Sequence, residues 1–228
     1  MMRAVYREED EQALVSSYLP ATGFFVEVGA CQPVALSQTW ELEQHGWNGF
    51  LIEPVPEQAE SLRRERQARV FEIACGPPEQ DGQKMPLYVA GPLSSLKFRR
   101  GPPKDVRIAT LDSVLAEAAA QHVDFLSVDV EGAELDVLRG LTFERYRPVL
   151  ILIEDFAEGL EKHNFMRARG YKRVRRTGNN TWYVPREVSF PISLFGRWQL
   201  LRKYYLSIPV RWLKQVFWSQ TRRRTRLK

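Results

Sequence analysis

The feature that most constrains the fold is the segment 24–30, which reads FFVEVGA. Its apolar and β-branched positions predict a buried β-strand, and Gly29 allows the backbone to turn sharply at the end of that strand. A second apolar segment, 49–54, follows about one helix later and carries Glu53 near its end. A buried strand, a glycine turn, a helix and a second strand ending in an acid are typical of a nucleotide-binding βαβ unit. In such a unit the turn faces the ligand, and the acid hydrogen-bonds the ribose hydroxyls.

The composition places the chain among globular proteins of ordinary size. With 228 residues, of which 44% are hydrophobic and 27% charged, it predicts one domain with a real core and an appendage. The two cysteines, Cys31 and Cys75, give neither a disulfide framework nor metal-ligand spacing, which favours a reducing compartment. The first residues lack the apolar core of a signal peptide, and no uncharged run approaches about 18 residues. We therefore expect a cytoplasmic protein without a membrane-spanning helix.

Charge is distributed unevenly along the chain. Of the 33 Lys and Arg residues, 11 lie from Arg186 onward, whereas only one of the 28 acids, Glu187, lies there. The remaining 22 basic and 27 acidic residues give the preceding part a net charge of −5, against +10 for the end of the chain. The same basic end holds three of the six tryptophans, namely Trp198, Trp212 and Trp218. The sequence thus predicts an acidic body, 1–188, followed by a basic, aromatic-rich helical tail, 189–228.

Apolar periodicity along the body predicts alternating strands and helices. Helices are expected at 4–19, 35–45, 57–67, 110–121, 133–139 and 158–169, and strands at 24–30, 49–53, 68–74, 106–109, 124–130 and 148–153. An additional strand is predicted at 85–90, and a hairpin at 171–176 and 181–184. Five βα units followed by a hairpin predict an α/β fold with three layers and a doubly wound, seven-stranded, mostly parallel sheet.

Acidic residues gather where the predicted strands end. Ligands of doubly wound sheets bind at the carboxyl ends of the strands, so these acids are the first candidates for a functional site. They are Glu27, Glu53, Asp129, Glu131, Glu154 and Asp155. A terminal antiparallel hairpin fits an S-adenosylmethionine-dependent methyltransferase better than a dehydrogenase.

Several sequence motifs lie at matching places in this layout. They are VEVGA (26–30), IEP-x-P (52–56), ACG (74–76), SSL (94–96), TLDSVL (110–115), VDVEGAE (128–134), VLRG (137–140) and ILIED (151–155). Together they resemble the FkbM family of methyltransferases over about residues 23–184, and VDVEGAE in register with IEP is the most specific part. Two positions depart from the family pattern. Glu27 stands where Asp is usual, and Pro33, which fixes φ and lacks an N–H, stands where Gly is usual.

The resemblance implies a class I methyltransferase with a Rossmann-like fold that binds S-adenosylmethionine. Glu53 is expected to hold the two ribose hydroxyls of this cofactor. The remaining cofactor contacts that the resemblance implies are, for the methionine end, Glu27 and the backbone of Gly29 and Ala30 and, for the adenine, Ala74 and Cys75.

The same resemblance places the chemistry after the predicted strand 124–130. Asp129 occupies the position of a base or a metal-binding acid, Glu131 is its neighbour in the same turn, and His163 is a second candidate base. The alternative is that Asp129 caps the helix beginning at Gly132, that Glu131 only structures the turn, and that His163 lies at the surface. We do not predict a metal ion, although Asp129 and Asp155 would form a carboxylate pair if they met.

The tail 189–228 lies outside the resemblance. Apolar residues recur at helical spacing at its start, namely Leu194, Trp198, Leu201 and Tyr205. A second helix is expected from Pro209, before the polybasic end 222–228. A basic helix rich in Trp and Leu is typical of an interfacial anchor on an anionic membrane, to which each Lys or Arg contributes on the order of 1 kcal/mol. The alternatives are packing onto the body, a dimer contact, and binding of nucleic acid, which an acidic body disfavours.

These observations predict a methyltransferase that uses S-adenosylmethionine and acts on a hydroxyl oxygen. The expected acceptor is a lipid, a glycan or a lipid-linked small molecule at the cytoplasmic face of a membrane. One alternative is a catalytically silent methyltransferase-like domain that binds a membrane or a partner. Another is a dinucleotide-dependent oxidoreductase, which the missing glycines and the terminal hairpin disfavour.

Overall fold

The structure, a computed structural model, describes residues 8–156 and 159–206. The chain divides into two compact units, Met1–Glu154 and Asp155–Lys228. The predicted boundary between body and tail, at residue 188, falls inside the second unit, and the functional division that it expresses stays a prediction.

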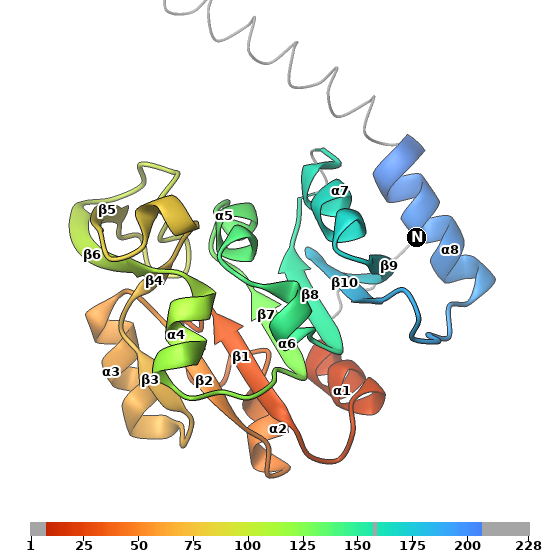
Figure 1. Ribbon diagram of the computed structural model, residues 1–228, viewed down its shortest axis with the longest axis horizontal. Coiled ribbons are helices and arrows are strands. Elements are labelled where there is room, and N and C mark those ends of the chain that lie inside the picture. Colours follow the sequence, from red (N-terminus) through yellow and green to blue (C-terminus); the bar gives the residue numbers. More distant parts are fainter. Residues whose placement is uncertain (1–7, 157–158, 207–228) are drawn as a thin grey trace, which may run out of the picture. The chain divides into compact units, whose positions relative to one another are not determined.

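Five parallel strands form the centre of the first unit (Figure 1). In spatial order they are β3 (Arg69–Phe71), β2 (Asn48–Ile52), β1 (Phe24–Val28), β7 (Phe125–Val128) and β8 (Leu150–Glu154). The chain runs outward from β1 to β3 and then crosses to β7, on the other side of β1. Val28 is level with both Ile52 and Val128, so these three strands end side by side. The reversal between β1 and β7 is the topological switch point at which such sheets bind ligands.

The central strands are apolar because helices cover them. Every residue of β7 and β8 is buried, as expected for strands of a parallel sheet covered on both faces. The helices of this unit are α1 (Glu8–Tyr18), α2 (Trp40–Gln44), α3 (Pro56–Glu65), α4 (Leu111–Glu117), α5 (Glu134–Arg139) and α6 (Phe143–Tyr146). Thr110 caps α4 through its side-chain oxygen, which accepts from the amide of Ser113.

The second unit contains α7 (Glu161–Ala168), the antiparallel hairpin of β9 (Tyr171–Thr177) and β10 (Asn180–Pro185), and α8 (Leu194–Leu201). A π-helical turn, Arg202–Leu206, continues α8. The hairpin and the five parallel strands of the first unit belong to one seven-stranded sheet. The predicted α/β fold with a mostly parallel sheet and a terminal antiparallel hairpin is therefore confirmed.

A small second sheet was only partly predicted. It consists of β4 (Ala74–Cys75), β6 (Pro103–Ala109) and β5 (Lys84–Tyr88), in that order. The predicted strand 68–74 is interrupted, because its first part pairs with β2 whereas Ala74 and Cys75 pair with β6. The predicted strands 85–90 and 106–109 both exist, and β6 begins earlier than expected because it pairs antiparallel with β5 along its length.

The predicted helix 35–45 is wrong in its first half, since α2 begins only at Trp40. The reason is that residues 37–39 form hydrogen bonds with a buried side chain in place of helical hydrogen bonds. The carboxylate of Glu27 accepts from the Gln38 amide and from the hydroxyls of Ser37 and Thr39, which holds this segment in a turn. The predicted helix 110–121 ends at Glu117, and α7 is shorter than the predicted 158–169.

Within residues 8–156 and 159–206, no helix combines the length and the apolar character needed to cross a bilayer. The predicted second helix after Pro209, with its tryptophans and the polybasic end, lies outside the described residues.

Candidate cofactor and active site

An open cleft lies at the carboxyl ends of β1, β2, β4 and β7, all within the first unit. It encloses about 540 Å³, including the solvent at its mouth. Among its lining residues are most of the predicted site residues, namely Gly29, Glu53, Ala74, Cys75, Asp129 and Glu131. The predicted edge of the sheet and the cleft therefore coincide.

The glycine turn after β1 determines how closely the strands approach each other at the cleft. Gly29 has φ of +84°, and a Cβ at this position would lie 1.8 Å from the carbonyl oxygen of Asp129. The amides of Gly29 and Ala30 both donate to the carbonyl of Ile52, at 2.9 and 3.2 Å. Gly29 lines the cleft, but the amides of Gly29 and Ala30 are already hydrogen-bonded to the end of β2. Their expected contact with the methionine end of a cofactor stays a prediction.

Glu53 presents a buried carboxylate in the cleft wall. One oxygen accepts from the amide of Cys31 at 3.0 Å and the other from the amide of Val55 at 2.8 Å. The residue is only 3% exposed, and this burial raises the pKa of Glu53 to about 7, against the two backbone hydrogen bonds that lower it. Each oxygen keeps a second lone pair, so the carboxylate can accept from two further hydroxyl groups. The contact of Glu53 with the ribose hydroxyls stays a prediction.

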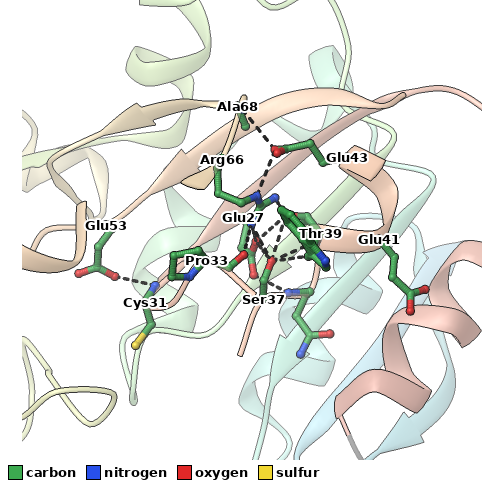
Figure 2. Close-up of polar contacts among 12 residues, drawn as sticks. Glu27, Cys31, Pro33, Ser37, Thr39, Glu41, Glu43, Glu53, Arg66 and Ala68 are labelled. Atoms are coloured by element: carbon green, nitrogen blue, oxygen red, sulfur yellow. Dashed lines mark hydrogen bonds and ion pairs between the residues drawn. The ribbon is translucent and has the colours of Figure 1, made fainter. Parts of the chain in front are cut away.

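Glu27 is not among the residues that line the cleft. Its carboxylate instead forms hydrogen bonds with neighbouring residues of the protein (Figure 2). Oε1 accepts from the amide of Gln38 at 2.6 Å, and Oε2 accepts from Ser37 Oγ at 2.9 Å and Thr39 Oγ1 at 2.5 Å. Burial raises its pKa, while Arg66, the largest opposing influence, and these hydrogen bonds lower it. The contact with a cofactor expected of Glu27 stays a prediction, and the structure gives the side chain a positioning role for the segment 37–39.

Arg66 closes the same network from the other side (Figure 2). Its guanidinium group is fully buried and lies 3.2 Å from the Glu43 carboxylate and 4.0 Å from that of Glu27. It also donates to Ser37 Oγ and Thr39 Oγ1, both at 2.9 Å, and to the carbonyl of Pro33 at 3.0 Å. Pro33, which stands where the family usually has Gly, therefore contributes to the structure of this loop. Its carbonyl is one of the acceptors that fix the loop.

Sequence reasoning missed Arg66, although a spacing signal was present. Ala59 and Leu62 are the buried positions of α3, and Arg66, the residue directly after this helix, continues their spacing in the sequence. Its neighbours Arg63 and Arg64 are exposed on the other faces. An arginine in register with apolar positions indicates a buried cation that needs buried acceptors.

Three carboxylates meet at the end of β7. One oxygen from each of Asp129, Glu131 and Glu154 lies within 4.8 Å of the others. Burial raises the pKa of Asp129, and the charge of Glu134 raises it further, whereas a hydrogen bond from Glu154 lowers it. Burial and the charge of Asp129 both raise the pKa of Glu154, so Glu154 is the protonated partner of the pair near neutral pH. Burial also raises the pKa of Glu131, which Arg100 opposes. Carboxylate oxygens are ligands for hard cations, so the group has the donor type that a divalent ion would require.

The structure contradicts the capping role considered for Asp129, and its active-site role stays a prediction. Helix α5 begins at Glu134, after an uncapped Ala133, and the amide of Gly132 donates to Glu134 Oε1 at 2.7 Å. Asp129 does not cap this helix and faces the cleft instead. Glu131 has φ of +52° and does structure the turn, since its carbonyl accepts from Ser95 Oγ at 2.7 Å.

The sequence left open whether Asp129 forms a carboxylate pair with Asp155, and the structure gives Asp129 a different carboxylate partner. Asp129 hydrogen-bonds Glu154, the last residue of β8. Asp155 belongs to the second unit, where its amide donates to the carbonyl of Asn179 at 2.9 Å. Side chains alternate between the two faces along a strand, so the sequence spacing did not reveal which of the two adjacent acids meets Asp129.

His163 lies on α7 in the second unit. Its ring stacks on Tyr183 with centroids 6.2 Å apart, and its Nδ1 is buried with no hydrogen-bond partner in the described part of the chain. Burial and the cation of Arg173 lower the pKa of His163 to about 4. The imidazole is therefore neutral at physiological pH, and its role as a base stays a prediction.

The wall of the cleft formed by β4 is apolar. Ala74 and Cys75 are buried and pair with Ile108 and Ala109 of β6, and Leu87 packs against the same cluster. Burial raises the pKa of the Cys75 thiol to about 12, so this side chain acts as a small apolar group. The adenine contact expected of these two residues stays a prediction.

The comparisons with known proteins agree with this geometry. The sequence matches the domain described as Methyltransferase FkbM over residues 27–173. Among the curated proteins, no match was found. In fold, the chain is similar to the methyltransferase FkbM from Methylobacillus flagellatus KT, with a TM-score of 0.52 and 15% identity. The alignment covers 74% of this chain and 45% of that structure, so the chain spans less than half of its length.

A second solved structure gives a weaker match. It is the precorrin-6y C5,15-methyltransferase from Geobacter metallireducens GS-15, with a TM-score of 0.42 and 12% identity, covering 81% of this chain and 90% of that one. The family match extends over well more than half of the chain and contains the glycine turn, Glu53 and the carboxylate group around Asp129. The chain belongs to the FkbM methyltransferase family.

Proposed function

We propose that the protein is an S-adenosylmethionine-dependent methyltransferase that acts on a hydroxyl oxygen. The observation that carries this proposal is that two carboxylates line one cleft, Glu53, which has acceptor capacity left beside its two backbone hydrogen bonds, and Asp129, whose pKa burial raises to about 7. The proposed acceptor is a hydroxyl of a lipid, a glycan or a lipid-linked small molecule that is presented at the cytoplasmic face of a membrane.

The residues of the cleft fit the proposed cofactor. Glu53 would accept from the two ribose hydroxyls, and the apolar wall around Ala74, Cys75 and Leu87 would cover the adenine. When bound, S-adenosylmethionine supplies an electrophilic methyl group on a sulfonium sulfur. The chain must then align the acceptor with this group, exclude water and remove a proton.

The carboxylate group around Asp129 supports proton removal. A base operating near neutral pH needs a pKa close to that range, and burial together with the neighbouring acids raises the pKa of Asp129 to about 7. Glu154 shares its proton, and Glu131 shapes the turn that presents Asp129 to the cleft. Asp129 is therefore the proposed base, with Glu154 as its partner.

The first test is calorimetric titration of S-adenosylmethionine into the purified protein and into Glu53→Ala. Loss of two hydrogen bonds to a charged group is expected to weaken binding by at least about tenfold. Glu57→Ala is the matched control, because Glu57 lies in the first turn of α3 and is exposed, where it forms an ion pair with Lys104. Absence of cofactor binding by the unaltered protein would favour the catalytically silent alternative.

Cofactor affinity is also expected to depend on pH through Glu53. Burial raises its pKa to about 7 in the free protein, and hydroxyl donors to its carboxylate would stabilise the ionised form and lower that pKa on binding. Binding therefore releases a proton below about pH 7, and affinity is expected to fall as the pH drops from 8 to 6. Titrations at several pH values measure this effect. Glu53→Gln should flatten the dependence, and an unchanged profile in that variant would assign it to another group.

A further inference from the structure

The start of the tail presents an unusual concentration of exposed apolar side chains. Within the described residues, six of the eleven large hydrophobic side chains that are exposed lie in 194–206. Leu194 is 85% exposed, Trp198 51% and Leu201 45%, and Phe195, Tyr205 and Leu206 are also exposed. Together these six residues are called the α8 face below. Soluble proteins seldom leave such a contiguous patch without a binding partner.

The segment that carries the α8 face is attached to the rest of the second unit through a buried tyrosine. Tyr204 is fully buried, and its hydroxyl accepts from Arg176 at 2.7 Å and contacts the hydroxyl of Thr181. The guanidinium group of Arg173 lies 3.4 Å from the centre of its ring. The helix itself begins with a Ser193 cap that accepts from the amide of Gly196 at 3.0 Å. One side of the segment is therefore anchored to the β9–β10 hairpin, beside which α8 lies in Figure 1, while the apolar face stays open.

Basic residues border the α8 face on both sides. At helical spacing Leu194, Trp198 and Leu201 form one stripe, and Arg197 and Arg202 fall to either side of it. Both arginines are exposed. The whole segment 189–228 contains ten Lys and Arg residues and no acid. This arrangement has an apolar centre and a cationic border.

We infer that the α8 face is a docking surface for an anionic lipid bilayer, and that it lies flat at the interface. Trp, Tyr and Leu side chains would enter the boundary between headgroups and acyl chains, while Arg197 and Arg202 would reach the lipid phosphates. Charge decides between this occupant and a second copy of the chain. Two copies meeting through this face would bring two acid-free cationic segments together, whereas an anionic surface complements them. The inference deepens the proposed function by naming the surface that would bring the protein to a membrane acceptor.

The test is co-sedimentation of the full chain with vesicles of phosphatidylcholine mixed with phosphatidylglycerol, and with phosphatidylcholine alone. Leu194→Ser with Leu201→Ser is expected to lower the partition coefficient on anionic vesicles by at least about tenfold. The matched control is Val34→Ser with Val149→Ser, which removes two exposed apolar side chains from the first unit. This control should bind as the unaltered chain does. Binding should also weaken as the salt concentration rises.

Three results would overturn the inference. Equal binding by the α8 variant and the unaltered chain would move the docking surface elsewhere, and no binding by either would leave the face to a protein partner. A dimer in light scattering that the α8 variant converts to a monomer, without any vesicle binding, would assign the face to a second copy. Co-sedimentation requires neither cofactor nor turnover, so its failure would leave the proposed methyl transfer untouched. Retained cofactor binding by the α8 variant shows that its first unit is folded.

Discussion

Asp129→Asn is expected to lower kcat by about 10² to 10⁴, the range typical for loss of a general base. The amide keeps the shape of the side chain but cannot accept the proton of the acceptor hydroxyl. Asp129 lines the cleft, and one of its carboxylate oxygens lies within 4.8 Å of Glu131 and Glu154. The substitution therefore changes the proposed base itself, and the expected loss of activity does not require a change in the fold. The measurement is single-turnover methyl transfer to an identified acceptor, with cofactor affinity measured in parallel. Affinity for S-adenosylmethionine should change much less than kcat.

The control for this prediction is Asp105→Asn, which changes an exposed aspartate on β6. It should leave kcat unchanged. If Asp129→Asn retained full activity, the base would lie elsewhere, and His163 in the second unit would become the next candidate. His163→Gln would then be the decisive variant, because a neutral imidazole with a pKa lowered to about 4 can accept a proton at physiological pH.

The rate of the unaltered enzyme is expected to rise with pH through about 7. The folded-state pKa of Asp129 is raised to that value by burial and by the surrounding acids, and a general base acts only after it has lost its proton. The same raised pKa values make the carboxylate group a source of stability at low pH, because the folded state binds protons that the unfolded chain would release. Stability contributed by this group should therefore fall as the pH rises through the interval in which activity appears.

Arg66→Ala is expected to destabilise the fold by about 3–5 kcal/mol, because it leaves buried carboxylates without their cation. Glu27 and Glu43 are both almost fully buried, and the guanidinium group that they share is not exposed at all. For a chain of this size, such a loss corresponds to a decrease in Tm of roughly 6–20 °C. Urea unfolding monitored by circular dichroism measures it. Cofactor affinity should also fall, since Arg66 fixes Ser37, Thr39 and the carbonyl of Pro33 behind the cleft.

Arg63→Ala is the matched control for this change. Arg63 lies on the same helix and forms an ion pair of 3.0 Å with Glu72, but the two side chains are 45% and 38% exposed. Exposed pairs contribute about 0–1 kcal/mol, so the two variants should differ clearly. Equal destabilisation by the two variants would show that the buried ion pairs of Arg66 contribute no more to stability than the exposed pair of Arg63.

The loss caused by Arg66→Ala should be smaller at pH 5 than at pH 8. Burial raises the pKa of Glu27 above its ordinary value even with Arg66 present, and removal of the cation would raise it further. The folded variant would then take up a proton more readily than the unfolded chain, which adds stability as the pH falls. A loss that stays constant with pH would contradict this account of the network.

The architecture could be predicted because its signals are local. Apolar runs predicted β1, β2, β7 and β8, Gly29 predicted the turn after β1, and the switch point followed from the connection rules for parallel strands. The same rules brought Glu53 and Asp129 to one edge, where the structure places both in one cleft. None of these inferences required knowledge of which side chains touch.

The contacts inside the site were decided by tertiary structure. Glu27 appeared in the sequence as a ligand of the cofactor, but its carboxylate is surrounded by donors that lie ten to twelve residues further along the chain. Those donors also shortened α2, which apolar periodicity had extended to residue 35. A buried carboxylate must be hydrogen-bonded, and that requirement outweighed the local preference for helix.

The sequence by itself determined the family, the alternation of strands and helices along the chain, and the edge of the sheet at which the acids gather. Only the tertiary structure decided that Arg66, and not Arg63, is buried beneath the cleft, and that Glu154, and not Asp155, shares a proton with Asp129. It also decided that Tyr204 anchors the start of the tail while Trp198 stays exposed. The physical reason is that backbone patterns follow from neighbouring residues, whereas burial and proton affinity depend on side chains brought together from distant parts of the chain.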